Sequence, residues 1–259
     1  MKIDLEAQLN AIIDEAVASN EGWFNLLKKI SECHQFSFKN LLLAYEQLGK
    51  APISLAGYKQ WLAKGIQVQK GEKAIYVYAP KFAKDKETGD QKVTGFIPVP
   101  VFDISQTDAE VHQPNPIQRL ESDQASELIP RLVEFATKLR FSVDLENETL
   151  EDSVNGTTDF RKRSIVVKNG LSPFHRTKTL IHEISHALLH EGVEPSRRAI
   201  CEVEAESSAY IVLSRLGYDS SAYSGVYVAT WSGGDRSNVL QALKGIEKAS
   251  KAILEALEA

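Results

Sequence analysis

The sequence of 259 residues has few of the features that mark secreted, membrane-spanning or disulfide-linked proteins. It contains only two cysteines, Cys33 and Cys201, so we expect no disulfide framework and a reducing compartment, the cytoplasm. No apolar run approaches the roughly 20 residues of a membrane helix, so we expect no membrane partner. The acidic, amphipathic start MKIDLEAQLNAIIDEA lacks the basic residues and the apolar stretch of a signal peptide.

An overall positive charge is also missing, but the charge is unevenly distributed along the chain. The formal net charge is −5, which argues weakly against a nucleic-acid-binding protein. Residues 50–92 nevertheless carry nine lysines against four acidic residues, a local charge of +5. The net charge therefore hides a basic segment in the first half of the chain.

Hydrophobic periodicity and composition divide the chain into two expected domains. Helical periodicity covers residues 3–19, 22–31, 37–49 and 54–63. Two later runs rich in Val, Ile, Tyr and Phe predict strands on either side of a charged hairpin tip at 84–91. The polar, proline-containing residues 105–117 predict a linker, so we place one domain at 1–117 and the second at 118–259.

The second domain is expected to be mostly helical. Helices are predicted over 120–140, 173–190 and 197–215 and from Ser237 onward, with a strand at 163–167. Ser172 and Pro173 are typical of a helix start. The predicted fold class is α+β, with N-terminal helices and a small antiparallel sheet followed by a mostly helical C-terminal domain with a small sheet.

The segment TLIHEISHALLH contains the pattern His182-Glu183-x-x-His186. On a helix, positions i and i+4 lie one above the other, so both imidazoles project toward one ion, with Glu183 within reach of a metal-bound water. The alternative is a chance match in a charged helix. The neighbouring positions are apolar, however, and two buried histidines without a partner would be costly, so we favour a metal site.

A third ligand must come from another part of the chain, because hydrolytic zinc sites use three protein ligands and an open position. The pattern Glu202-x-x-Ala205-Glu206 resembles a segment of gluzincin-type metallopeptidases, in which the first Glu binds metal and the residue four positions on supports a ligand histidine. This resemblance implies Glu202 as a ligand and Glu206 as its supporting residue. Glu204 is expected to point elsewhere, and a solvated acidic face is the alternative for these glutamates.

Other residues near the motif have less specific interpretations. His190 falls in the last helical turn, where interaction with the helix dipole is expected rather than ligation. Cys201 is interpreted as a core residue. If the site is catalytic, the ion activates a water, Glu183 takes its proton, and a tyrosine stabilises the oxyanion. The candidates for that tyrosine are Tyr210, Tyr218, Tyr223 and Tyr227.

Aromatic residues and lysines are interleaved in the basic segment of the first domain. Single-stranded nucleic-acid binding requires rings that stack on bases beside cations that follow the phosphates. The alternative is a strand whose aromatic residues face the core while its lysines face solvent. The residues that we expect at a DNA interface are Tyr58, Trp61, Lys64, Lys70, Lys73, Tyr76 and Tyr78.

Longer segments of the sequence resemble a known family. FSFKNLLLAYEQ, AGYKQWLAKGIQVQKGEKAIYVYAPKF and PVFDISQT resemble the N-terminal domain of ArdC-type antirestriction proteins. HEISHALLH, EVEAESSAYIV and LGYDSSAYSGVYVATWSGGD resemble the ArdC metallopeptidase-like domain, which is related to the ImmA/IrrE zinc peptidases. The resemblance covers most of residues 20–240 in the right order and leaves 141–162 and the C-terminal helix unmatched.

The resemblance implies a single-stranded DNA-binding protein of a mobile element that shields incoming DNA from restriction. It also implies that His182, His186 and Glu202 bind one divalent metal and that Glu183 is the base. We expect zinc, with manganese or cobalt as alternatives, because two imidazoles and a carboxylate suit several ions.

Three hypotheses follow for the function. The first is a DNA-binding antirestriction protein whose metal domain is secondary. The second is an ImmA-like peptidase that cleaves a protein substrate, a repressor or a restriction protein. The third is a binding module in which a structural metal ion links two helices. This hypothesis is disfavoured because structural metal sites usually have four protein ligands.

Overall fold

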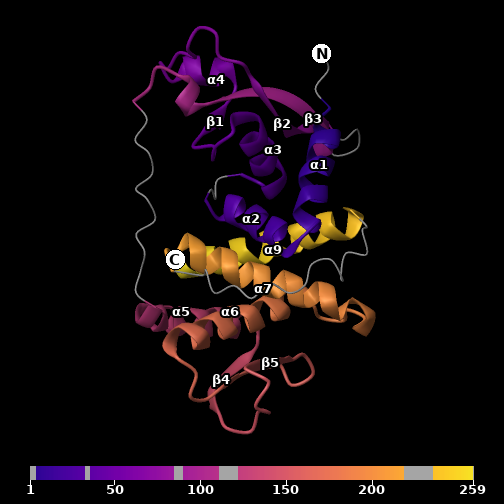
Figure 1. Cartoon of the computed structure of the whole chain (residues 1–259), viewed down its shortest axis with the longest axis vertical. Helices are drawn as coiled ribbons and strands as arrows, with labels where there is room; N and C mark the ends of the chain where they lie inside the picture. Colours follow the sequence, from indigo (N-terminus) through magenta and orange to yellow (C-terminus); the bar gives the residue numbers. More distant parts are fainter. Residues whose placement is uncertain (1–3, 33–35, 85–89, 111–121, 219–235, 259) are drawn as a thin grey trace. The chain divides into compact units, whose positions relative to one another are not determined.

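The computed structural model describes residues 4–32, 36–84, 90–110, 122–218 and 236–258. Mixed helix and sheet structure with two small sheets confirms the predicted α+β class (Figure 1). The chain divides into two compact units, one of residues 1–12 and 32–116 and one of residues 13–31 and 117–259. Residues 13–31 thus group with the C-terminal part of the chain, which periodicity alone does not indicate. No helix in the described ranges combines the length and the apolar character needed to cross a bilayer.

The first unit begins with part of helix α1 (Leu5–Val17) and contains one long helix beside a small sheet. As predicted, the helix α3 (Phe38–Leu48) starts at Ser37, whose hydroxyl accepts a hydrogen bond from the backbone N–H of Asn40, and ends at Gly49 with a φ of 68°. The remaining elements are β1 (Leu55–Ala56), α4 (Tyr58–Ala63), β2 (Ile75–Lys84), β3 (Gln91–Asp103) and η1 (Ile104–Gln106). The helix predicted at 54–63 starts later, because residues 55–56 pair with β3 instead.

The antiparallel sheet of the first unit has the strand order β1-β3-β2, so β2 is an edge strand. Helix α3 covers part of that edge through two side-chain amides. Asn40 bonds to the backbone N–H and carbonyl of Tyr78, and Gln47 does the same for Tyr76. These bonds occupy main-chain groups that would otherwise pair with another strand.

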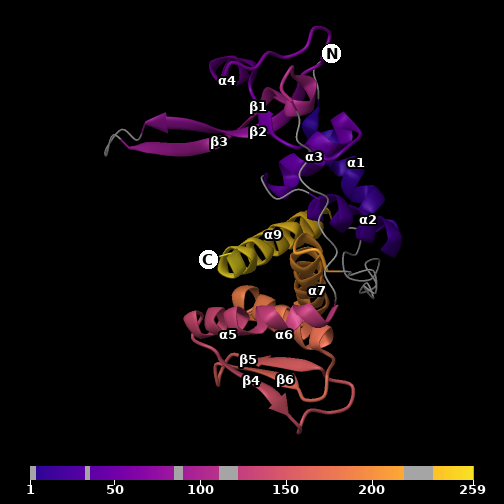
Figure 2. The same cartoon turned by 90° about the vertical axis from the view of Figure 1, so that its left-hand side faces the viewer.

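Strands β2 and β3 continue beyond this core as a two-stranded arm, which Figure 2 shows extending past α3 and α4. The arm comprises residues 79–84 and 91–98. Its apolar side chains face solvent, and Phe82 and Phe96 are 54% and 66% exposed. An isolated hairpin has no core on which to bury such side chains.

The second unit contains most of the helices and a second sheet. Its strands have the order β4-β6-β5, with β4 parallel and β5 antiparallel to β6. Of these, the sequence predicts only β6; β4 and β5 are short and mostly polar, so they lack the apolar pattern of a strand. The elements of this unit are α2 (Asn20–Ser31), η2 (Ser122–Leu128), α5 (Ile129–Lys138), β4 (Ser142–Asn147), β5 (Gly156–Asp159), β6 (Ser164–Lys168), α6 (Pro173–Leu189), η3 (Pro195–Arg197), α7 (Arg198–Arg215) and α9 (Arg236–Glu258).

Helix α6 lies between the second sheet and α7, as Figures 1 and 2 both show. Its residues Leu180, Ile181 and Ile184 are fully buried in the core of the unit. Helix α2 packs on the other side of α7, where the indole N–H of Trp23 donates to Ser207 over 3.2 Å. Packing on both sides therefore fixes α6 and α7 against each other, and these two helices carry the predicted metal ligands.

Candidate metal centre

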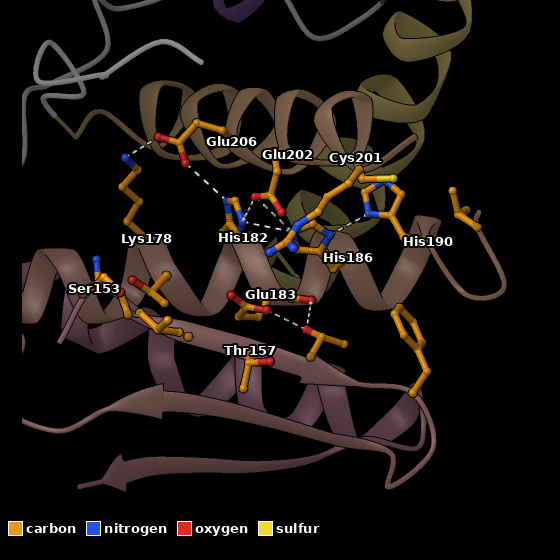
Figure 3. Close-up of a pocket in the computed structure, with 18 of the residues that line it drawn as sticks. Ser153, Thr157, Lys178, His182, Glu183, His186, His190, Cys201, Glu202 and Glu206 are labelled. Carbon is orange, nitrogen blue, oxygen red and sulfur yellow. Dashed lines mark hydrogen bonds and ion pairs between the residues drawn. The ribbon is translucent and has the colours of Figure 1, made fainter. Parts of the chain in front are cut away.

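Helix α6 presents His182 and His186 one turn apart on the face toward α7, as the i, i+4 spacing predicts. Their Nε2 atoms are 3.0 Å apart. Glu202 of α7 reaches the same point, with Oε2 at 3.4 Å from Nε2 of His182 and 3.7 Å from Nε2 of His186 (Figure 3). Three donor atoms from two packed helices thus converge on one small space.

This donor set fits a divalent transition-metal ion. The three atoms lie within 4.8 Å of one another, and each of the three residues is only partly exposed. Two imidazole nitrogens and one carboxylate oxygen suit zinc and also manganese or cobalt. These are the three residues named as ligands from the sequence, and the structure brings them together.

Glu206 lies behind this site, where the sequence resemblance places a supporting residue. Its Oε2 is 3.3 Å from Nδ1 of His182, the ring nitrogen that faces away from the three donors. Its other oxygen forms an ion pair with Lys178, one turn before His182 on α6. Lys178 is not among the residues predicted for the site, although its i, i+4 spacing from His182 places both on one helix face.

Nearby carboxylates control the protonation of the site without metal. Burial lowers the pKa of His182, but hydrogen bonds to Glu202 and Glu206 outweigh this effect and raise the pKa to about 9. Hydrogen bonds to His182 and His186 hold the pKa of Glu202 well below its usual range. Glu202 is therefore ionised. In the absence of a metal ion, a proton on His182 provides the positive charge at the site.

Glu183, the candidate base, is 5% exposed and points from α6 toward strand β5. The hydroxyl of Thr158 lies 2.8 Å from its Oε2. Burial raises the pKa of Glu183, opposed by His182, His186 and this hydrogen bond. The sequence does not single out Thr158, because the strand that carries it lacks the apolar pattern from which a strand is predicted.

A cleft of about 810 Å³ joins the histidines to strand β5. His182, Glu183 and His186 line it together with the β5 residues 156–158. β5 is an edge strand of its sheet, so one side of its main chain does not pair with β6. The cleft therefore places the three motif residues beside a strand edge.

His190, Cys201 and Glu204 form a second, buried group next to the three donors. His190 is the C-cap residue of α6, and its ring contacts the ring of His186, with 2.7 Å between the two Nδ1 atoms. Its Nε2 lies 2.8 Å from Oε2 of Glu204. Glu204 thus points to His190. Burial, and then Glu204, raise the pKa of the Cys201 thiol.

Of the four tyrosines considered for oxyanion stabilisation, the two that lie in the described part of the chain, Tyr210 and Tyr218, do not line the cleft. Tyr210 and Tyr218 are 5% and 6% exposed, and the ring of Tyr210 packs against Phe24 with 5.3 Å between ring centroids. Both therefore belong to the core of the unit. Tyr223 and Tyr227 lie outside the described residues.

The residues predicted at a DNA interface differ in exposure. Tyr58 is 55% exposed, whereas Tyr76 and Tyr78 are half-buried and Lys39 lies over the ring of Tyr78. Trp61 is 2% exposed and its indole N–H donates to the backbone carbonyl of Phe102, so its ring is not accessible for stacking on a base. The exposed lysines of the predicted set are Lys64, Lys70 and Lys73.

Comparison with known proteins finds one family match in each half of the chain. Residues 5–116 match the family described as the N-terminal domain of anti-restriction factor ArdC. Residues 139–214 match the IrrE N-terminal-like domain of a peptidase family and include His182, His186 and Glu202. An uncharacterized protein of Bacillus anthracis is 25% identical over 262 residues, 83% of this chain and 44% of that protein. The chain thus spans less than half the length of this curated relative.

Two solved structures share the fold of almost the whole chain. They are the metal-free and the Mn(II)-bound crystal structures of the antirestriction ArdC protein from the R388 plasmid. Each is 20% identical to this chain with a TM-score of 0.59, over 96% of this chain and 97% of the other. Both domain types and their order therefore agree with the resemblance found in the sequence.

Proposed function

The chain combines an ArdC-type N-terminal domain with an IrrE-like peptidase-type domain, and on this premise we propose that it is a single-stranded DNA-binding antirestriction protein of a mobile element. The first unit binds the DNA. The second unit carries a divalent-metal centre of the peptidase type. Both activities belong to the cytoplasm, where incoming DNA meets restriction enzymes.

The exposed arm of β2 and β3 supports DNA binding most directly. Phe82 and Phe96 are more than half exposed, and Lys81, Lys84 and Lys92 of the same arm are also exposed. Rings of this kind stack on unpaired bases, whereas duplex DNA keeps its bases stacked on each other. Lysines beside the rings neutralise phosphates. This combination favours single strands over duplex.

Fluorescence anisotropy of the full chain with a labelled single-stranded oligonucleotide and its matched duplex tests this proposal. We expect tighter binding to the single strand and an affinity that falls steeply as salt rises, because phosphate contacts release counterions. Equal affinity for single strand and duplex, or no binding to either, would contradict the proposal.

In the second unit, His182, His186 and Glu202 would hold one divalent ion, with zinc expected and manganese or cobalt as alternatives. A bound ion supplies Lewis acidity, which polarises a carbonyl group and lowers the pKa of water. Glu206 orients the ring of His182 through Nδ1. The Lys178 ammonium holds the Glu206 carboxylate in place for that contact.

A peptidase that cleaves a repressor or a restriction protein is the second candidate function. Its support is that Glu183 lines the same cleft as both histidines and has a raised pKa, which suits a group that accepts and returns a proton. Among the described strands β5 stands at the edge of its sheet and its residues 156–158 line this cleft, and an extended peptide can add to such an edge by main-chain hydrogen bonds. The chain's own residues thus provide both peptide alignment and a proton acceptor.

The variant Glu183→Gln separates the two candidates, because it keeps the size of the side chain and removes its basicity. If the protein acts as a peptidase, this variant loses its biological effect while it still binds metal and DNA. If DNA shielding is the function, the variant keeps its effect. Metal binding measured by titration on both proteins is the control for an intact site.

A further inference from the structure

A buried chain of hydrogen bonds leads away from the metal donors on the side of His186. The ring of His190 turns back so that its Nδ1 lies 2.7 Å from Nδ1 of His186. On its other side, His190 Nε2 lies 2.8 Å from Oε2 of Glu204. His190 and Glu204 are only 7% and 8% exposed, so water competes little for these hydrogen bonds. Figure 3 shows His190 following His182 and His186 along one line.

The carboxylate of Glu204 also lies close to the backbone of helix α9. A methyl group placed on Gly245 of that helix would lie 2.5 Å from Oε1 of Glu204, closer than atoms can approach. Gly245 therefore leaves the space that this carboxylate occupies. A buried carboxylate needs a hydrogen-bond donor, and His190 provides one.

The number of protons available to these hydrogen bonds determines which ring nitrogen donates and which accepts. Two nitrogens 2.7 Å apart share one proton, so one Nδ1 donates and the other accepts. When Nε2 of His186 binds an ion, its proton resides on Nδ1, which must then be the donor. His190 accepts at Nδ1 and carries its own proton on Nε2. That proton points to Oε2 of Glu204.

We propose that His190 and Glu204 are positioning residues, which hold the metal-binding tautomer and the orientation of the His186 ring. This proposal rests on the metal centre proposed above and extends it beyond the three ligands. Glu206 has the corresponding task at His182, so each ligand histidine has its own supporting acid. Glu206 contacts its histidine directly, whereas Glu204 acts through a second imidazole.

The same proton positions argue against a second metal ion bound by His190, Cys201 and Glu204. Donor atoms of His190, Cys201 and Glu204 lie within 4.8 Å of one another and have the composition of a metal site. With an ion on His186, however, Nε2 of His190 carries a proton and has no lone pair to offer. One ion is therefore expected at these two neighbouring groups of the described residues, with Cys201 beside the hydrogen bonds and not as a ligand.

Zinc titration of the full chain against a chromophoric chelator tests the proposal. We expect one zinc ion per chain for the wild type. His190→Ala removes the acceptor and lowers the affinity about 10- to 100-fold, the usual effect of losing such an outer partner. His190→Asn offers an oxygen near the position of Nδ1 and recovers most of this loss. Cys201→Ala is the matched control and keeps the wild-type affinity and stoichiometry.

Nitrogen-edited NMR of the histidine rings in the zinc-loaded wild type gives a second readout that does not depend on a variant. The proposal expects the proton on Nδ1 of His186 and on Nε2 of His190. A proton on Nδ1 of His190 would overturn it. So would a second zinc ion that Cys201→Ala removes, or an unchanged zinc affinity in a folded His190→Ala.

The same titration separates this proposal from the metal centre on which it rests. A wild type that binds one zinc ion with an affinity insensitive to His190→Ala overturns the positioning role alone. A wild type that binds none of zinc, manganese and cobalt overturns the metal centre and the positioning role together. Thermal unfolding of each variant without metal establishes that a lost affinity does not come from a lost fold.

Discussion

The hydroxyl of Thr158 lies 2.8 Å from Oε2 of Glu183, so an edge strand of the second sheet positions the candidate base on the neighbouring helix. The same hydroxyl lies 3.0 Å from the backbone carbonyl of Glu183. Strand β5 thus contacts both the side chain and the main chain of this residue. The orientation of the base depends on a strand that has no metal ligand of its own.

Replacing Thr158 by valine should raise the pKa of Glu183 further, because the lost hydrogen bond is one of the interactions that lower it. The variant also leaves a buried carboxylate without this donor, at a cost of about 1–3 kcal/mol in the free energy of unfolding. Carbon-detected NMR titration of the Glu183 carboxyl measures the shift. Thr158→Ser restores the hydroxyl and should restore the wild-type value; a pKa that is the same in Thr158→Val and in the wild type would refute this role.

Strand β5 approaches helix α6 so closely that Gly156 has no room for a side chain. A methyl group there would lie 2.6 Å from Cγ2 of Thr179 and 2.8 Å from Oε1 of Glu183. Gly156→Ala should therefore cost about 1–3 kcal/mol through overpacking and displace Glu183. Gly57→Ala is the control, since its methyl group meets no atom closer than 3.5 Å. Equal thermal unfolding midpoints for the two variants would show that β5 adapts without cost.

Metal binding should depend strongly on pH. In the metal-free protein His182 has a pKa of about 9, so at neutral pH an ion must displace its proton. Affinity should rise about tenfold per pH unit toward pH 9 and then level off. Glu206→Gln removes one of the three carboxylates that raise this pKa, so the affinity should level off at a lower pH. Calorimetric titration at several pH values measures both curves, and an affinity that is constant from pH 6.5 to 9 would rule out the protonated His182.

DNA binding should depend on exposed rings of the first unit and not on the buried one. Phe96→Ser should weaken binding to a single strand by about 1–3 kcal/mol, the usual loss for a ring that stacks on a base. Trp61 is packed in the core, so Trp61→Phe should change stability while leaving affinity nearly unchanged in the folded protein. Anisotropy on both variants distinguishes the two rings. If Trp61→Phe weakened binding more than Phe96→Ser, the DNA would bind elsewhere on the first unit.

The metal centre could be predicted from the sequence because helical spacing alone brings its residues to one face. His182 and His186 are four positions apart on α6, as are Glu202 and Glu206 on α7. Local geometry fixes such pairs before any packing is known. That Glu202 of the second helix binds the same ion as the two histidines followed only from the resemblance to metallopeptidases.

The contacts that complete the site could not be predicted, because they depend on packing between distant segments. Thr158 lies on a strand of mostly polar residues, and Gly245 is one of many glycines in the chain. Likewise, the interleaving of aromatic residues with lysines predicts Trp61 at a DNA interface, whereas the structure buries it against β3. The choice between core and surface for an aromatic residue is made by tertiary contacts.

The proposed function as a whole is tested most directly by transferring an unmodified single-stranded plasmid into recipient cells with an active restriction system, with and without this protein. The number of cells that receive the plasmid should rise with the wild type and equally with Glu183→Gln, and less with a variant that carries both Phe82→Ser and Phe96→Ser. Cells without the restriction system are the control and should show no effect of the protein. No protection by the wild type would contradict the account, and protection that requires Glu183 would make the peptidase its function instead.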